Sequence, residues 1–106
     1  MSTEESLVSV VIPTLNRSTM LMRAIESVCQ QTYKNIEIIV IDDCSDTPVQ
    51  LDNYNGSCPL TISRNKERLG GAASRNRGAE LANGTYISFL DDDSMDIIYI
   101  NYLFLL

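Results

Sequence analysis

The sequence predicts an α/β domain built on an open, mostly parallel sheet with helices on both faces. Its segments alternate as strand, helix, strand and again strand, helix, strand, which is the pattern of parallel sheets. The predicted strands are continuous apolar runs such as "LVSVVIP" and "IEIIVI". Strands of this kind are buried on both faces, as a sheet between two layers of helices requires.

The first half of the chain supplies two strands around one helix. Residues 7–13 form a β-rich run ending in a proline, and residues 36–41 form a second apolar run. Residues 18–31 carry apolar side chains at helical spacing, and Ser18 or Thr19 stands where an N-cap is expected. The apolar positions of this helix are Leu21, Ala24, Ile25, Val28 and Cys29.

The second half repeats the arrangement after a turn-rich stretch. Residues 42–59 hold at most a short helix. Residues 60–63 form a third, weaker strand, and residues 85–90 form a fourth. Residues 70–83 are expected to be helical after a glycine pair, with Gly84 as the C-terminal cap.

Composition bounds the size and the partners of the domain. The 106 residues, 44% of them hydrophobic, suit one small globular domain with a modest core. A net charge of -6 argues against a surface that binds nucleic acid or an anionic membrane. The sequence contains no histidine, which excludes histidine metal sites and Ser-His or Cys-His catalysis.

The cysteines and the lack of targeting signals indicate the compartment. Cys29, Cys44 and Cys58 are odd in number and lack C-x-x-C spacing, so we expect reduced cysteines in a cytosolic protein. The N-terminus does not have the layout of a secretory signal, and no apolar run reaches transmembrane length. We therefore expect a cytoplasmic protein, or one placed at a membrane face by regions outside this chain.

Polar and charged residues follow every predicted strand. They occupy residues 14–17, 42–46, 64–68 and 91–93. The carboxyl ends of parallel strands lie along one edge of a sheet, where ligands bind at the switch in strand order. Four such loops together indicate a binding site at that edge.

Three consecutive acids, Asp91, Asp92 and Asp93, follow the last predicted strand. Neighbouring carboxylates repel by about 1 kcal/mol per pair in water, so open solvent or a cation has to compensate. Asp91 and Asp93 are separated by one residue, so in an extended chain both side chains can project to the same side. Such a pair of carboxylates can bind Mg²⁺ or Mn²⁺. The alternative is a solvated acidic turn. The position at the end of a buried strand, beside a second acidic loop, favours the metal.

Asp42 and Asp43 end the second predicted strand. An aspartate here can accept a hydrogen bond from a base N–H or a ribose hydroxyl. The alternative is a receiver-type signalling module, which also places paired acids after an apolar strand to bind Mg²⁺. A receiver would need a lone phosphoacceptor aspartate after a later strand and a lysine after another, and the order of residues here does not supply them.

Two further stretches suit a phosphate. Thr14, Asn16 and Arg17 stand in a loop before a helix N-terminus, where backbone N–H groups and a guanidinium suit a nucleotide, although an ordinary capped turn fits equally. The stretch "RLGGAASRNRG" joins a glycine pair to three arginines. Two of them, Arg75 and Arg77, cannot face the same way on a helix, so at most one is expected to reach the ligand.

The chain resembles the N-terminal half of family 2 glycosyltransferases, which have the Rossmann-like GT-A fold. The resemblance runs over residues 7–93, in the order and spacing of "VSVVIPTLNR", "AIESVCQQTYKNIEIIVIDDCSD" and "GGAASRNRGAELANGTYISFLDDD". It implies a nucleotide-diphospho-sugar donor, UDP-sugar or another. It also implies inverting hexosyl transfer to a hydroxyl of a sugar, glycan or lipid acceptor.

The resemblance also implies roles for individual residues. Asp91 and Asp93 match the family's D-x-D motif, whose role is to hold a divalent cation, Mn²⁺ or Mg²⁺, on the diphosphate. Asp43, with Asp42 beside it, is expected to contact the base or the ribose. The remaining nucleotide-sugar-binding residues implied are Pro13, Thr14, Asn16, Arg17, Arg75 and Asp92.

The chain departs from the family after the D-x-D motif. Members continue through an acceptor-binding half that carries a catalytic-base carboxylate, and Asp96 does not match that base by position. We therefore expect a truncated, donor-binding half that does not complete transfer alone, or an inert fragment of the same fold. Residues 94–106 are atypical and apolar, so we expect self-association through residues 97–106.

Overall fold

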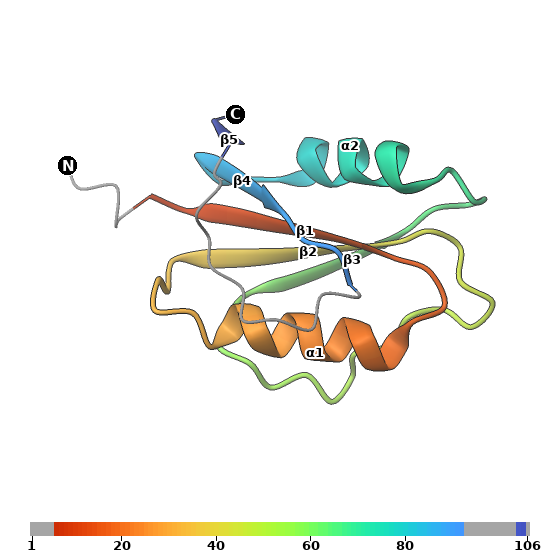
Figure 1. The fold of residues 1–106 in the computed structure, drawn as a ribbon, viewed down its shortest axis with the longest axis horizontal. Coiled ribbons are helices and arrows are strands. Elements are labelled where there is room, and N and C mark those ends of the chain that lie inside the picture. Colours follow the sequence, from red (N-terminus) through yellow and green to blue (C-terminus); the bar gives the residue numbers. More distant parts are fainter. Residues whose placement is uncertain (1–5, 93–103, 106) are drawn as a thin grey trace.

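The computed structural model describes residues 6–92 and 104–105. Its five-stranded sheet has the order β3-β2-β1-β4-β5, with one helix on each face (Figure 1). The first four strands are parallel, and β5 runs antiparallel to β4. The predicted α/β class is therefore confirmed. The elements are β1 Val8–Thr14, α1 Ser18–Cys29, β2 Ile36–Asp42, β3 Leu60–Arg64, α2 Gly71–Leu81, β4 Tyr86–Phe89 and β5 Phe104–Leu105.

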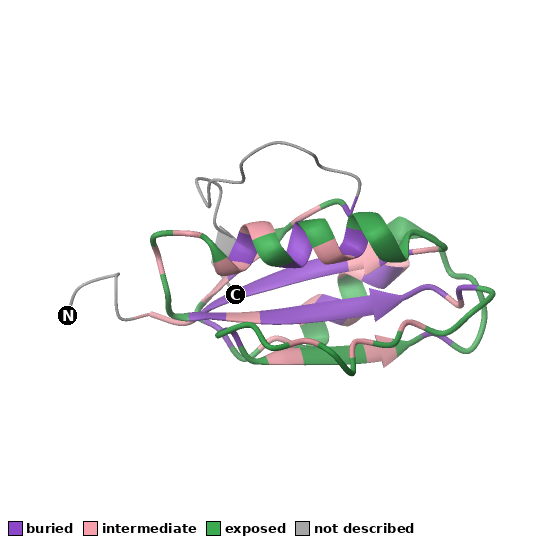
Figure 2. Ribbon diagram, turned by 90° about the horizontal axis from the view of Figure 1, so that it is seen from below, coloured by how far each residue is buried: buried purple, intermediate pink, exposed green. Residues whose placement is uncertain are grey.

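The central strand of the sheet is β1. It pairs with β2 over its whole length, from Val8 opposite Ile36 to Thr14 opposite Asp42, and with β4 on its other side. Both β1 and β2 are buried almost throughout (Figure 2). Their unbroken apolar sequences follow from this position, because neither face of these strands reaches water.

Successive residues of these strands face opposite helices and so divide the core in two. The cluster against α1 combines alternate strand residues with one face of the helix: Val8, Val10, Ile12, Ile36, Ile38, Val40, Leu21, Ala24, Ile25 and Val28. The cluster against α2 is smaller and contains Val11, Ile39, Ile41 and Ile87. Most apolar burial therefore lies on the α1 face.

The helix predicted over residues 18–31 is confirmed as α1, although it ends at Cys29, two residues earlier. The prediction that Ser18 or Thr19 caps it was wrong. The N-cap is Arg17, whose carbonyl accepts a 2.8 Å hydrogen bond from the N–H of Leu21, and no side chain caps the helix. Both hydroxyl residues lie inside the first turn, past the position from which a side chain can cap.

The second helix packs against the sheet through small residues. Its buried positions are Ser74 and Gly78, and an added Cβ at Gly78 would lie 2.2 Å from Cγ1 of Val11 in β1. Only a residue without a side chain permits this approach of helix and strand. The helical prediction for residues 70–83 is thus confirmed over Gly71–Leu81.

The cap role predicted for Gly84 was wrong. The helix C-cap is Ala82, which is already extended with φ -69° and ψ 137°, so the chain leaves the helix before Gly84. Gly84 instead lies tightly against the start of β1. Its N–H donates to Ser9 Oγ at 2.8 Å, and an added Cβ would lie 2.7 Å from the carbonyl oxygen of Leu7.

The loop between β2 and β3 is irregular and contains no helix over residues 43–59. Tyr54 anchors it to the α1 side of the core. The Tyr54 hydroxyl donates to the carbonyl of Cys58 at 2.7 Å and lies 3.4 Å from the thiol of Cys29. Cys29, Cys44 and Cys58 are all free thiols, as the sequence predicted.

The strands predicted over residues 60–63 and 85–90 are confirmed as β3 and β4. Asp93, Asp96 and most of residues 97–106, to which the predicted self-association belongs, lie outside the described residues. Within residues 6–92 and 104–105, neither helix has the length and apolar character needed to cross a bilayer.

We expect Gly78→Ala to lower the free energy of unfolding by about 1–3 kcal/mol, because the new methyl overpacks against β1. Urea denaturation measures this loss. Gly71→Ala in the same helix is the control, since its Cβ would meet only the Nη1 end of the flexible Arg75 side chain, at 3.3 Å. If the two variants were equally stable, α2 would not pack on β1 in this way.

Candidate functional site

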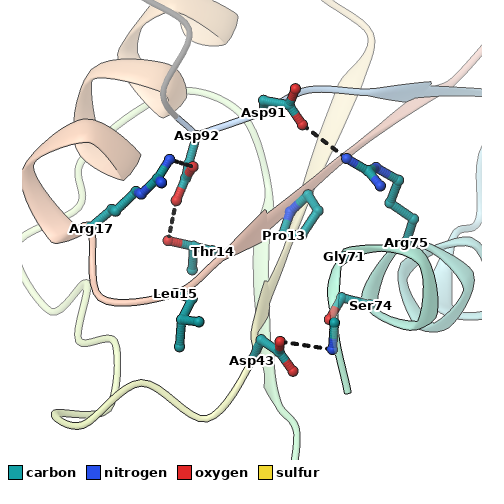
Figure 3. A pocket seen from close by; sticks show the side chains of 11 residues that line it. Pro13, Thr14, Leu15, Arg17, Asp43, Gly71, Ser74, Arg75, Asp91 and Asp92 are labelled. Atoms are coloured by element: carbon teal, nitrogen blue, oxygen red, sulfur yellow. Dashed lines mark hydrogen bonds and ion pairs between the residues drawn. The ribbon is translucent and has the colours of Figure 1, made fainter. Parts of the chain in front are cut away.

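A pocket of about 290 Å³ opens at the carboxyl edge of the sheet (Figure 3). Its volume is near the lower end of the range for small-molecule pockets. Four segments line it: the end of β1 with the loop that follows, the first residue after β2, the start of α2 and the loop after β4. The lining residues are Pro13, Thr14, Leu15, Arg17, Asp43, Gly70, Gly71, Ser74, Arg75, Asp91 and Asp92.

The strand order explains why the pocket lies there. The chain runs outward from β1 through β2 to β3, then returns past β1 to form β4. The loops after β1 and β4 therefore leave the sheet on either side of a switch point, where open α/β sheets bind ligands. The prediction that the polar loops meet at one edge is confirmed for these two loops, which line the pocket together with Asp43.

Asp92 joins the two loops at the switch point. Its side chain is 9% exposed, and its carboxylate accepts a 2.7 Å hydrogen bond from Thr14 Oγ1 and lies 3.5 Å from Nη1 of Arg17. The other acid on this loop, Asp91, has a side chain that is 65% exposed. These two neighbouring acids thus differ in position. Asp92 lies at the floor of the pocket, and Asp91 lies at its rim.

Arg75 reaches Asp91 from α2. Its Nη2 lies 3.1 Å from Oδ1 of Asp91, and both side chains line the pocket. Arg77 points elsewhere, donating to Ser63 Oγ at 2.6 Å and to the Asn65 side chain. Of these two arginines, Arg75 lines the pocket and Arg77 does not.

Asp43 receives donors from the segment that leads from β3 into α2. Its carboxylate accepts hydrogen bonds from the N–H of Leu69 at 2.8 Å, the N–H of Gly70 at 3.0 Å and Nδ2 of Asn65 at 2.8 Å. Burial acts to raise the pKa of Asp43, but these hydrogen bonds and the charge of Arg68 outweigh it, so the pKa lies below its ordinary value.

Asp42 does not line the pocket, contrary to the prediction that it stands beside Asp43 at the ligand. It is 1% exposed, and its carboxylate accepts from the N–H of Ser45 at 2.9 Å and of Val49 at 3.0 Å. Arg64 adds an ion pair at 2.9 Å. Burial acts to raise the pKa of Asp42, yet these donors prevail and the pKa is lowered. Asp42 holds the following loop in place.

Asn16 also lies outside the pocket lining, contrary to its predicted place in the nucleotide pocket. It has φ 55°, a left-handed conformation that asparagine tolerates. Its N–H donates to Ser45 Oγ at 2.9 Å, and its Oδ1 accepts from the N–H of Asp46 at 2.8 Å. Asn16 thus ties the loop after β1 to the loop after β2.

Four residues that line the pocket were not named among the predicted site residues. Leu15, Gly70, Gly71 and Ser74 line the pocket, and the glycine pair before the helix was the available signal for two of them. Ser74 could have been found from its spacing, since it lies one helical turn after Gly70 and its N–H bonds the Gly70 carbonyl at 3.0 Å.

The described residues hold no cluster of three or more potential metal-ligating side chains. Asp91 provides carboxylate oxygens at the rim, and Asp93, its predicted partner, lies outside the described residues. Asp42, Asp43 and Asp92 are instead compensated by backbone N–H groups, hydroxyls and arginines. These three carboxylates therefore do not need the expected cation to balance their negative charge.

Comparison with known proteins shows similarity over most of the chain. Residues 9–96 match the family model of glycosyl transferase family 2. An uncharacterized glycosyltransferase of Haemophilus influenzae is 40% identical over 87 residues, which cover 82% of this chain and 29% of that protein. The Escherichia coli UDP-Glc:alpha-D-GlcNAc-diphosphoundecaprenol beta-1,3-glucosyltransferase WfaP is 39% identical over 88 residues, covering 82% of this chain and 35% of WfaP.

A solved structure has the same fold. S. aureus TarS 1-349, in complex with UDP-GlcNAc, superposes with a TM-score of 0.73 at 27% identity, covering 81% of this chain and 26% of that one. This match confirms the predicted GT-A, Rossmann-like fold. The receiver alternative is not favoured: doubly wound folds of that kind place β1 between β2 and β3, whereas here β1 lies between β2 and β4. The chain spans about a third of the length of the two curated relatives.

We expect the lowered pKa of Asp42 to make stability depend on pH. A carboxyl whose pKa is lower in the folded protein than in the unfolded chain stabilises the fold. This stabilisation is fully present above the unfolded pKa, about 3.9, and is lost as the pH falls through the folded pKa. Asp42→Asn should cost about 1–3 kcal/mol at pH 7 and should lose less stability than the wild type between pH 7 and 3. Urea denaturation across this range measures both.

The matched control is Asp52→Asn, a change of the same chemistry at an exposed loop residue. It should keep the wild-type dependence on pH. Asp43 and Glu37 also have lowered pKa values, so some acid sensitivity should remain in Asp42→Asn. An Asp42→Asn variant as acid-sensitive as the wild type would show that Asp42 is not held as described.

Proposed function

Because the chain belongs to glycosyl transferase family 2, we propose that the pocket binds the nucleoside diphosphate of a sugar donor, for transfer of the sugar to an acceptor hydroxyl. The observation that carries this is the placement of Asp43 opposite Arg17 and Arg75 around one pocket at the switch point. A carboxylate accepts hydrogen bonds from a base or ribose, and guanidinium groups pair with phosphates. A nucleoside diphosphate offers both partners.

Two of the similar proteins support a UDP-sugar as donor. WfaP is named for UDP-Glc, and TarS was solved with UDP-GlcNAc. In the proposal, Asp43 accepts from the uracil N–H or a ribose hydroxyl, while Pro13 and Thr14 form the adjoining wall. Arg17 and Arg75 supply positive charge toward the diphosphate.

The N-terminus of α2 supports the placement of the phosphates. Gly70 and Gly71 line the pocket where the helix begins, and Gly70 has φ 92°, which favours glycine. A helix N-terminus carries partial positive charge and unpaired N–H groups. With no side chains in the way, a phosphate can approach this backbone closely.

We further propose that Asp91 and Asp93 hold a divalent cation, Mn²⁺ or Mg²⁺, at the rim. The described member of the pair fits, since the mostly exposed carboxylate of Asp91 lines the pocket and offers the oxygen ligands that these ions prefer. When bound, such a cation neutralises the diphosphate and stabilises it as the leaving group. Arg75 adds a second positive charge on the same side of the pocket.

Completing the transfer requires an acceptor site and a base. We propose that the carboxylate that deprotonates the acceptor lies in the part of the relatives that this chain does not span, and that transfer inverts the anomeric centre. The residues of this chain would bind and orient the donor. They would contribute to catalysis by placing the anomeric carbon of the donor for attack by the acceptor and by excluding other orientations of the donor.

The test is a thermal-shift panel of UDP, GDP, CDP and TDP, each with Mn²⁺ and again with chelator. A nucleotide at about a hundred times its dissociation constant adds about 2.7 kcal/mol, which is on the order of 10 °C for a domain of this size. We expect UDP to give the largest shift and chelator to reduce it. A flat panel from folded protein would contradict the proposal and leave an inert fragment of the fold.

Arg75→Met should reduce the UDP shift, because it removes a phosphate-facing charge while keeping the aliphatic part of the side chain. Arg23→Met is its matched control, since Arg23 is an exposed residue of α1 that does not line the pocket. The affinity of UDP by titration calorimetry should fall about tenfold in the first variant, the loss of one charge-assisted hydrogen bond, and stay unchanged in the second. Equal affinities would remove Arg75 from the site.

A further inference from the structure

We propose that Asn65 and Arg77 act as positioning residues, forming a hydrogen-bonded relay that fixes the Asp43 carboxylate for the incoming ligand. The relay consists of Arg77 in α2, Asn65 after β3 and Asp43 after β2. Neither Asn65 nor Arg77 lines the pocket. The proposal rests on the proposed function for the identity of the ligand, and on the geometry of the relay for everything else.

Asn65 is the centre of the relay. It is 2% exposed, and its N–H donates to the Asp42 carbonyl at 2.8 Å, which continues the β2–β3 pairing by one residue. Its Nδ2 donates to Oδ1 of Asp43 at 2.8 Å and to Oγ of Ser74 at 3.0 Å. One amide group therefore links the ends of two strands to a pocket-lining residue of α2.

Arg77 determines which way this amide points. A guanidinium has donors only, so the Asn65 atom that it contacts must be the amide oxygen. The amide nitrogen is then turned toward Asp43. Arg77 is held in its turn by Ser63 Oγ, at 2.6 Å. Without Arg77, the amide could rotate and present its oxygen to the carboxylate, replacing an attraction with a repulsion.

The relay fixes the position of the Asp43 carboxylate and leaves it able only to accept hydrogen bonds. All three of its hydrogen-bond donors belong to residues 65–70, and each favours the ionised carboxylate. An ionised carboxylate can only accept, so a ligand group that meets it has to donate. Because the protein orders this carboxylate before the ligand arrives, binding does not have to supply the cost of ordering it.

Several charged groups lie around Asp43. The charge of Arg68, in residues 65–70, lowers the pKa of Asp43. Asp42 precedes Asp43 in the chain. Charged residues from three other elements line the same pocket. A test therefore has to change the relay and leave these groups in place. The pocket-lining charges are Arg17 after β1, Arg75 on α2, and Asp91 and Asp92 after β4.

The variants are Asn65→Ser, which removes the amide, and Arg77→Met, which removes only the group that orients it. The first readout is the titration of the Asp43 carboxyl carbon by NMR, in the 106-residue chain without nucleotide. Both variants should move the Asp43 midpoint to higher pH, with the larger movement in Asn65→Ser. Asn55→Ser, the same substitution at an exposed loop residue, is the control and should leave the midpoint unchanged.

The second readout is the affinity for UDP with Mn²⁺ by calorimetry between pH 7 and 4.5. The terminal phosphate of UDP is protonated over this range, which weakens binding to every variant, and Asn65→Ser should weaken several-fold more than the wild type on acidification. At pH 7 it should bind about tenfold more weakly than the wild type, since the orientation of Asp43 is lost as well. A residue with a merely structural role would not change the dependence on pH.

The outcomes separate this inference from the proposed function. Wild-type protein that binds none of the nucleotides would overturn the function, while the NMR titration would still decide the relay. Nucleotide binding with an unmoved Asp43 midpoint in both variants would overturn the relay alone. If Asn65→Ser does not fold, the half-exposed Arg77→Met decides the question, and a wild-type midpoint in that variant refutes the inference.

Discussion

The structure depends on how carboxylates at the ends of buried parallel strands obtain hydrogen-bond donors. Asp42, Asp43 and Asp92 are each at most 7% exposed, so water solvates them far less than it solvates a surface carboxylate. Asp42 takes donors from the chain after β2 and from Arg64 of β3. Asp43 takes donors from the chain after β3, and Asp92 from the end of β1. Meeting this one requirement orders the whole carboxyl edge of the sheet.

This ordering divides the pocket into a rigid floor and an open rim. The floor consists of Asp43 and Asp92. Backbone N–H groups and Asn65 donate to Asp43, and Thr14 and Arg17 contact Asp92. The rim carries Asp91, whose side chain is 65% exposed, and Arg75, whose side chain is 41% exposed; an ion pair of the kind that contributes little to stability joins them. Such a pair can exchange partners when a charged ligand arrives, because little is lost when it opens.

The two faces of the sheet have different roles. On the α1 face, large aliphatic side chains provide most of the buried apolar area and so most of the hydrophobic stabilisation. On the α2 face, Gly78 brings the helix close to β1, and Ser74 points its hydroxyl toward Asn65. Close packing there sets the position of the helix N-terminus at the pocket. One layer stabilises the domain, and the other positions the site.

The sequence by itself determined the α/β class, the four parallel strands, both helices and the edge at which the site lies. It could do so because burial on both faces leaves unbroken apolar runs, and because Asp43, Arg17 and Asp92 follow such runs directly. Only the tertiary structure decided that Asp42 and Asn16 turn away from the pocket and that Asn65 and Arg77 stand behind Asp43. Adjacent aspartates are equivalent in a sequence. They become different when strand alternation turns one toward the loop that it holds and the other toward the pocket.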